Sequence, residues 1–416
     1  MNESTTTQVA GEAQIPWAPL AGVMATVAIF AVAQGLTYPL LSFILERQGA
    51  SAGLIGLSAA MTPLGLIAGS TLIPGLIRRL GSGVLGLGCA ITAGTALALI
   101  GWTQDVVAWF PLRFTIGLAI GPLFVLSETW LIALSPARRR GRILGIYTAV
   151  VSAGFAAGPL SLMAVGTEGW PPFLIGVGAF ALCTCWLAAI RRRLPDLGRE
   201  DEHASVRDVV GLAPALLLAV VTTAAFEQGL LSLLPVYGSS YGIGERNLSA
   251  LLTMLIAGNI ALQVPLGLAA ERWTVRGASI ACALATLLGC LLLPLLIATP
   301  LVWPFFFLWG AVSFGIYTLA LIEVGERLSG ALLIAANSAF ALAWGVGGIA
   351  GPPAFGVVMD LVGVQGLPAS FCALYRADAR ALPPETSTLS RRRFRRQDGR
   401  QLQHKTEIEP LRLTLP

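Results

Sequence analysis

Residues 143–166, ILGIYTAVVSAGFAAGPLSLMAVG, decide what kind of protein this chain is, because no charged side chain interrupts them. The hydrocarbon core of a bilayer is about 30 Å thick, and a helix of roughly 20 apolar residues crosses it. No water is present there to bond exposed backbone groups, so a spanning segment must pair its N–H and C=O groups within a helix. The stretch therefore predicts a transmembrane helix.

The rest of the chain has the same character. Charged residues make up only 12% of its 416 residues and hydrophobic residues 55%, whereas a soluble domain carries about 25% charged residues. Eleven apolar spans are expected, at residues 17–42, 52–77, 83–103, 106–133, 143–166, 170–190, 209–236, 247–269, 277–298, 301–323 and 330–358. The sequence thus predicts an all-α membrane protein whose short links make sequential helices antiparallel.

The arginines lie mostly in one of the two sets of links. With the N-terminus in the cytoplasm, the cytoplasmic links hold Arg78, Arg79, Arg138, Arg139, Arg140, Arg142, Arg191, Arg192, Arg193, Arg199, Arg207, Arg272, Arg276 and Arg327. The opposite links hold only Arg47 and Arg246. Because cytoplasmic loops are enriched in Lys and Arg, this bias predicts a cytoplasmic N-terminus. No basic region precedes the first apolar run, so we expect a retained helix rather than a signal peptide.

The charged segment 191–208 divides the chain into two hydrophobic halves and is expected to be a cytoplasmic linker. A cytoplasmic N-terminal segment, 1–16, comes before the first half. The first half, 17–190, is expected to form a six-helix bundle, and the second half, 209–365, a bundle with five clear helices. This organisation indicates a duplicated bundle.

Two short motifs occur in both halves and support duplication. The tripeptide QGL recurs at residues 34–36 and 228–230, an offset of 194. The pattern G-x-x-x-G-P recurs with an offset of 193, first as Gly154, Gly158 and Pro159 and then as Gly347, Gly351 and Pro352, and Gly117 and Gly310 share that register. Parallel repeats of this kind are typical of transporters whose binding site lies between the two halves.

Three motifs within residues 17–365 resemble those of the major facilitator superfamily. They are the G-x-x-x-G-P pattern, which resembles the motif of its proton-coupled antiporters; the loop with Gly267, Glu271, Arg272 and Arg276; and Arg113 four residues before Gly117. The resemblance implies two six-helix bundles and a secondary transporter of the proton-coupled drug or sugar type. It also implies that the loop acid and arginines hold one conformation.

Each motif also has a purely structural interpretation. Small residues four apart let helices pack closely, and the loop is also explained by the enrichment of cytoplasmic links in basic residues. The matching loop of the first half, residues 69–79, keeps Arg78 and Arg79 but has no acid at the expected position. The gating role of that first loop is therefore in doubt.

Ionisable residues inside membrane helices are costly and are candidates for function. Glu227 lies well inside the seventh span, and Glu128 lies nearer the cytoplasmic end of the fourth. A carboxyl that is neutral when protonated and charged when empty can link proton movement to substrate movement, so both are candidate proton-coupling residues. Arg113 keeps its charge and must meet water, an acid or an anionic substrate. A structural acid or a solvated helix end is the alternative for the carboxyls.

Neutral polar and aromatic residues in the same spans are candidates for substrate binding, together with Arg113. They are Gln34, Trp130, Gln228, Asn259, Gln263 and Tyr317. Asn259 and Gln263 are four residues apart and share a helix face. For each of them, hydrogen bonding between helices is the competing interpretation.

The end of the chain departs from the family pattern. After Asp360 the apolar run is too short to span a bilayer, and an arginine-rich stretch follows within residues 366–416. A twelfth helix is therefore expected to be missing or altered. The tail is interpreted either as the product of a frameshift or as a disordered basic tail that binds acidic lipid heads.

These observations favour a secondary transporter of a small organic solute in the inner membrane, working by alternating access with protons as coupling ion. Export is slightly favoured, and import by proton symport and a membrane sensor that does not transport are the alternatives. We expect no enzyme activity, no cofactor, no metal site and no nucleic-acid partner, since the chain lacks a nucleophile–base pairing, a metal-ligand cluster and a soluble domain. Its partners are expected to be the solute, protons and lipid, and the chain a monomer.

Overall fold

The computed structural model describes residues 17–135, 140–195, 210, 213–272, 274–328 and 331–381. Within these ranges it contains helices and their links but no strand. The helices are α1 (Trp17–Arg47), α2 (Ala52–Leu80), α3 (Ser82–Thr103), α4 (Val106–Leu134), α5 (Arg140–Val165), α6 (Pro171–Ile190), the short 3₁₀ helix η2 (Arg191–Arg193), α8 (Pro214–Ser239), α9 (Glu245–Arg272), α10 (Val275–Leu296), α11 (Val302–Arg327), α12 (Ala331–Val362) and α13 (Gly366–Ala381). Ten helices in the described part are long and apolar enough to cross a bilayer, which confirms the all-α membrane fold.

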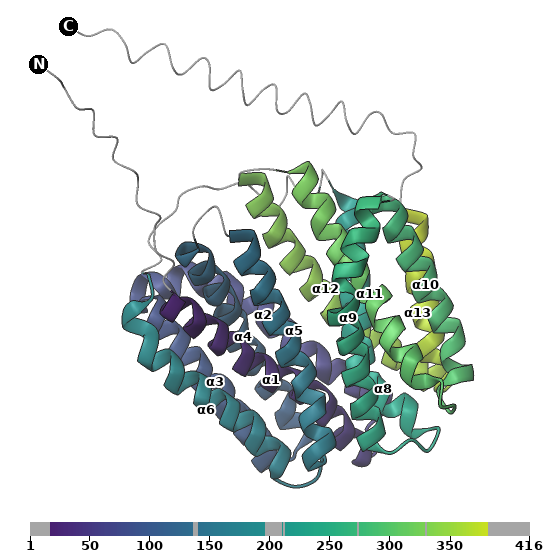
Figure 1. Ribbon diagram of the computed structural model, residues 1–416. Coiled ribbons are helices and arrows are strands. Elements are labelled where there is room, and N and C mark those ends of the chain that lie inside the picture. Colours follow the sequence, from purple (N-terminus) through teal and green to yellow (C-terminus); the bar gives the residue numbers. More distant parts are fainter. Residues whose placement is uncertain are drawn as a thin grey trace, which may run out of the picture.

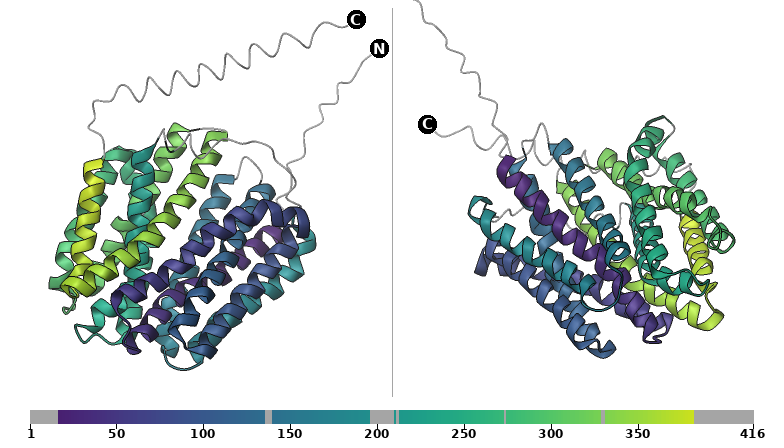
Figure 2. Two further views of the ribbon diagram at one scale, coloured as in Figure 1. Left: turned by 180° about the vertical axis from the view of Figure 1, so that it is seen from behind. Right: turned by 60° about the horizontal axis from the view of Figure 1, so that its bottom comes forward.

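The helices form two bundles that lie side by side (Figures 1 and 2). Helices α1–α6, coloured purple to teal, make the first bundle, and α8–α13, coloured green to yellow, make the second. The bundles meet where α2 packs on α12, α5 on α9 and α1 on α8. We refer to the membrane face at which α1 ends as the Arg47 end and to the other face as the opposite end.

The two bundles repeat the same close helix crossings. Adding a Cβ atom to Gly117 of α4 would place it 1.9 Å from the Thr62 carbonyl oxygen of α2. In the second bundle, the same atom on Gly310 of α11 would lie 2.0 Å from the Leu255 carbonyl oxygen of α9. These backbones touch because glycine leaves no side chain between them. The predicted internal repeat is therefore seen as equivalent packing.

The G-x-x-x-G-P glycines lie at a second repeated crossing. A Cβ on Gly158 of α5 would lie 2.2 Å from the Leu36 nitrogen of α1. On Gly347 of α12 it would lie 2.3 Å from the Val221 carbonyl oxygen of α8. Both copies of the motif thus hold a helix tightly inside its own bundle. Any gating by these residues remains a prediction.

Residues 366–381 form helix α13, which differs from the expectation that they belong to an unstructured tail. Phe371 of α13 packs on Phe226 of α8, with ring centroids 4.8 Å apart, and on Phe355 of α12 at 5.1 Å. Leu367, Phe371 and Tyr375 recur every four residues and are buried. The sequence reasoning required a continuous apolar run and so overlooked a helix that is apolar along one face only. At 16 residues it is about 24 Å long, short for a full span; the remaining predicted tail, 382–416, lies outside the described residues.

Gly258→Ala is expected to destabilise the fold. Its new methyl group would lie 1.8 Å from the Phe307 carbonyl oxygen and force α9 away from α11, and overpacking of this kind costs about 1–3 kcal/mol. Gly88→Ala in α3 is the matched control, because nothing lies within 4 Å of its Cβ position. Thermal unfolding in detergent should show a lower midpoint for Gly258→Ala alone. Equal midpoints for the two variants would contradict the close crossing.

Candidate functional site

Arg113 of α4 lies in the interior of the protein. Its Nη1 donates a hydrogen bond to the Ser58 hydroxyl of α2 at 3.2 Å, and its guanidinium carbon lies 5.7 Å from the centre of the Tyr38 ring of α1. The side chain is fully buried, and its Nε and Nη2 atoms find no hydrogen-bond partner among the described residues. A cation over an aromatic face is stabilised by the ring quadrupole, but two unsatisfied donors remain costly. This guanidinium is therefore held with spare hydrogen-bonding capacity.

Tyr38 connects the two bundles electrostatically. It lies within electrostatic range of Arg113 of its own bundle and of Glu227 of α8 in the other, and beside Thr62 of α2. Glu227 is half-buried near the middle of α8. Glu227 therefore lies within electrostatic range of the first bundle.

A second tyrosine, this one in the second bundle, also lies near charged groups of both bundles. Tyr317 of α11, in the second bundle, interacts with Glu227 and also with Glu128 of α4 in the first bundle. Glu128 in turn interacts with Tyr147 of α5, whose hydroxyl lies 3.3 Å from the Ser127 hydroxyl.

These charged and hydroxyl side chains lie within electrostatic range of their neighbours across the interface of the bundles. We call Arg113, Tyr38, Glu227, Tyr317 and Glu128 the charged row. Arg113 and Glu128 are fifteen residues apart on α4, which is about 22 Å along the helix axis. The row therefore extends through much of the depth of the membrane.

The sequence identified the ionisable members of the row and Tyr317 but missed Tyr38. Tyr38 lies one turn after Gln34 on α1, in the helix that carries the QGL repeat. Residues four apart share a helix face, so its spacing from Gln34 was the available signal. Apolar composition around it made it look like a core aromatic residue.

Gln34 and Gln228 are the first residues of the two QGL copies. Both side chains are buried, one on α1 and the other on α8, and the carbonyl oxygen of each has no hydrogen-bond partner in the described part of the chain. Gln228 packs beside Gly348 of α12, which also touches Pro63 of α2. The interface between the bundles thus contains unsatisfied acceptors as well as unsatisfied donors.

The remaining predicted site residues are not all brought together. Trp130 is fully buried and would lie 3.2 Å from a Cβ on Gly86 of α3, so it packs inside the first bundle and not in the charged row. Tyr317 also stacks edge-on against Trp344 of α12 at 5.1 Å. Asn259 is half-buried on α9 beside the Gly258 crossing, and the side chain of Gln263 lies outside the described residues.

The predicted loop motif lies at the opposite end of α9. Arg272 is exposed there, and Arg276 is half-buried at the start of α10 and has a polar partner. The Glu271 side chain and the surroundings of Gly267 lie outside the described residues. The role of this loop motif in gating therefore stays a prediction.

Comparison with known proteins places this architecture in a family. The family model described as Major Facilitator Superfamily matches residues 23–352. The chain belongs to the major facilitator superfamily. Its match covers most of both bundles, so it agrees with the two-bundle fold and with the resemblance seen in the motifs. Membership makes the protein a multi-pass membrane transporter and not an enzyme.

Relatives within the superfamily are similar along most of their length. The chain is 28% identical over 344 residues to the MFS-type transporter YfkF of Bacillus subtilis, covering 80% of this chain and 87% of that protein. It is 23% identical over 326 residues to the MFS-type transporter YcaD of Escherichia coli, covering 76% and 82%.

Solved structures of transporters share the fold at low sequence identity. The nucleoside transporter NupG superposes with a TM-score of 0.70 at 13% identity, covering 87% of this chain and 96% of that one. A bacterial homologue of the human lysosomal transporter Spinster, in an inward-facing and unoccupied conformation, gives 0.69 at 14% identity, covering 89% and 94%. These likenesses establish the shared fold.

Arg113→Met is expected to leave the thermal stability of the transporter unchanged or raised. The substitution removes a buried charge whose donors are partly unsatisfied and keeps an apolar side chain of similar length; replacement of buried ionic groups by apolar ones often stabilises by about 1–4 kcal/mol. Arg47→Met is the contrasting variant, because it removes the partner that lies 2.7 Å from Glu245. Unfolding midpoints in detergent should fall for Arg47→Met only. A larger fall for Arg113→Met would show that Arg113 is a structural requirement.

Proposed function

We propose that this transporter moves a small organic solute across the inner membrane by alternating access, that protons are the coupling ion, and that export is favoured over import. The observation that carries the proposal is the charged row, in which Glu227 of one bundle interacts with Tyr38 of the other. Arg113, Gln34 and Gln228 supply candidate contacts for the solute. The protein works in this proposal as a monomer, with Asn259, Gln263 and Trp130 as further candidates for solute binding or for shaping its site.

The proton step follows from the position of Glu227. When ionised, the carboxylate is attracted to hydrogen-bond donors of the first bundle such as the Tyr38 hydroxyl, which favours contact between the bundles in this region. Protonation makes the carboxyl neutral and removes that attraction. In a low-dielectric interior such a change is large, so it biases the equilibrium between two arrangements of the bundles. Glu128, linked through Tyr317, provides a second proton site nearer the opposite end.

Import by proton symport is the alternative, and it would use the same residues. The proton gradient would then drive the solute into the cell instead of out of it. The direction is supported on the export side by the G-x-x-x-G-P motif and by nothing else in the site. A sensor that binds without transport is kept as an alternative because the first-half loop has Arg78 and no acid in its sequence.

Glu227→Gln is expected to abolish dependence of transport on a pH gradient while leaving the protein folded. The amide keeps the shape and polarity of the side chain but cannot gain or lose a proton. Purified protein in proteoliposomes would be tested with a panel of nucleosides, sugars, organic acids and cationic dyes under an imposed gradient. Glu168→Gln, in the exposed link between α5 and α6, is the matched control and should behave like the parent.

Gradient-driven flux that survives in Glu227→Gln would remove this residue from proton coupling. If the folded parent moves no member of the panel, the sensor becomes the better interpretation. The sign of the gradient that drives accumulation separates export from import.

The N-terminus is proposed to lie in the cytoplasm, so that the Arg47 end faces outward. Thr103→Cys at the Arg47 end and Arg79→Cys at the opposite end, both exposed positions, would be made in a background without the native cysteines. A membrane-impermeant maleimide added to intact cells should label Thr103→Cys directly and Arg79→Cys only after permeabilisation. The reverse pattern would invert the proposed orientation.

A further inference from the structure

At the Arg47 end, hydrogen bonds tie the two bundles together at three places. The first is between α12 and α2, where Asp360 accepts from the backbone N–H groups of Ala52 at 2.9 Å and Gly53 at 2.8 Å. The first N–H groups of a helix have no partner within the helix and carry a partial positive charge. A carboxylate from the second bundle thus caps the start of a helix in the first.

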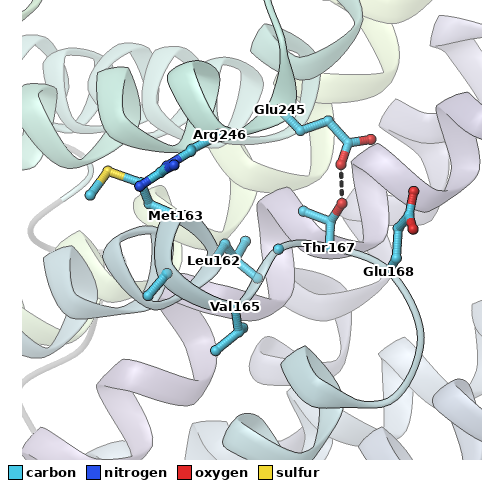
Figure 3. Close-up of a pocket in the computed structure, with 9 residues that line it drawn as sticks. Leu162, Met163, Val165, Thr167, Glu168, Glu245 and Arg246 are labelled. Atoms are coloured by element: carbon cyan, nitrogen blue, oxygen red, sulfur yellow. Dashed lines mark hydrogen bonds between the residues drawn. The ribbon is translucent and has the colours of Figure 1, made fainter.

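The second place joins the link after α5 to the start of α9 (Figure 3). The Thr167 hydroxyl donates to the Glu245 carboxylate. Arg47 at the end of α1 donates to both oxygens of Glu245 at 2.7 and 2.9 Å, and to the hydroxyl and carbonyl oxygens of Thr167 at 2.7 and 2.9 Å. This ion pair lies beside a pocket that is lined by residues from both bundles.

The third place is between α1 and α8, where the Ser239 hydroxyl donates to the Glu46 carboxylate. The charges of the neighbouring Arg47 and Glu245 also act on this carboxylate. It therefore connects the ends of the first helices of the two halves.

The three places are related by the internal repeat. An offset of 193 residues converts Thr167 into Asp360 and Ala52 into Glu245, so the first two contacts are equivalents of each other. In each, the end of one helix in one half meets the start of a helix in the other half. The same offset converts Glu46 into Ser239, so the third contact joins two equivalent positions and lies at the pseudo-two-fold axis that relates parallel repeats.

The opposite end does not repeat this charge pattern. Under the same offset, Arg78 at the end of α2 corresponds to Glu271 at the end of α9. An arginine cannot accept a hydrogen bond from the start of a helix, and its charge is repelled by the positive helix terminus. Within the described residues, the repeat-related polar contacts between the bundles lie at the Arg47 end.

We infer that these three contacts act as one latch, here called the outer latch (Glu46, Arg47, Asp360, Thr167, Ser239 and Glu245), which holds the Arg47 end closed and must break as a unit when that end opens. Because each bundle is internally packed through its glycine crossings, the contacts are lost together when the bundles rotate apart. The inference rests on the proposed alternating access. It assigns the charged residues Asp360 and Arg47 to the control of conformation, away from the solute.

The test is a distance measurement between nitroxide labels in the full-length protein, made without substrate. One label pair, Thr103→Cys and Leu301→Cys, reports on the Arg47 end, and a second pair, Arg79→Cys and Gly325→Cys, reports on the opposite end; all four positions are exposed. Asp360→Ala should raise the ratio of open to closed molecules at the Arg47 end by about tenfold or more, because it removes two hydrogen bonds to a charged group that the closed arrangement makes. The fraction of molecules with the short distance at the opposite end should rise correspondingly.

The matched control is Asp105→Ala. Asp105 also caps a helix at the Arg47 end, by accepting from the Val107 N–H at 3.2 Å, but both residues lie in the first bundle. The control should lower stability slightly and leave both distance distributions unchanged. An equal shift in Asp105→Ala would mean that loss of any cap loosens the protein, which would overturn the latch.

A charge exchange separates the latch from general damage to the fold. Arg47→Glu alone should open the Arg47 end, and Arg47→Glu combined with Glu245→Arg should close it again. If the label distances at both ends respond to an imposed pH gradient but not to Asp360→Ala or Arg47→Glu, alternating access stands and the latch is wrong. Distances that are the same in every variant and at every pH would overturn both.

Discussion

The absence of water from the bilayer core is the constraint on which the rest of this structure depends. Each backbone N–H and C=O group inside it must be bonded within its own segment, which leaves helices as the elements of this chain. The hydrophobic effect no longer drives helices together there, so association depends on close packing and on polar contacts between them. Glycine crossings such as Gly117 against Thr62 supply the close packing within each bundle.

The same constraint explains where polar side chains lie. A charge cannot face lipid cheaply, so Arg113, Glu227 and their tyrosine partners lie inside the protein and communicate across the interface of the bundles. Interactions within a bundle form when the bundle folds and are unaffected when the two bundles move as rigid bodies. Interactions across the interface exist in only some arrangements of the bundles, and these are the ones that a change of protonation or a bound solute can influence.

The charged row and the outer latch are connected by shared helices. Tyr38 and Glu46 lie on α1, eight residues apart, which is about 12 Å along the helix. Glu227 and Ser239 both lie on α8, twelve residues apart. A movement of α1 against α8 that changes the distance between Tyr38 and Glu227 must therefore also strain the bond between Glu46 and Ser239, so the two sets of contacts respond to the same rotation.

The sequence by itself determined the class of fold, because hydropathy, arginine distribution and a repeat of 193 residues are local properties of the chain. It also identified Arg113, Glu227 and Glu128, since a charge within an apolar run is visible without any structure. Only the tertiary structure decided which groups come together: that Tyr38 lies near both Arg113 and Glu227, that Trp130 belongs to the core of one bundle, and that a half-apolar segment after residue 365 forms α13. The reason is physical. Periodicity and composition report how a helix meets lipid or solvent, whereas a cap such as Asp360 on the start of α2 joins residues 307 and 308 positions apart in the chain, and that pairing exists only after both bundles have packed.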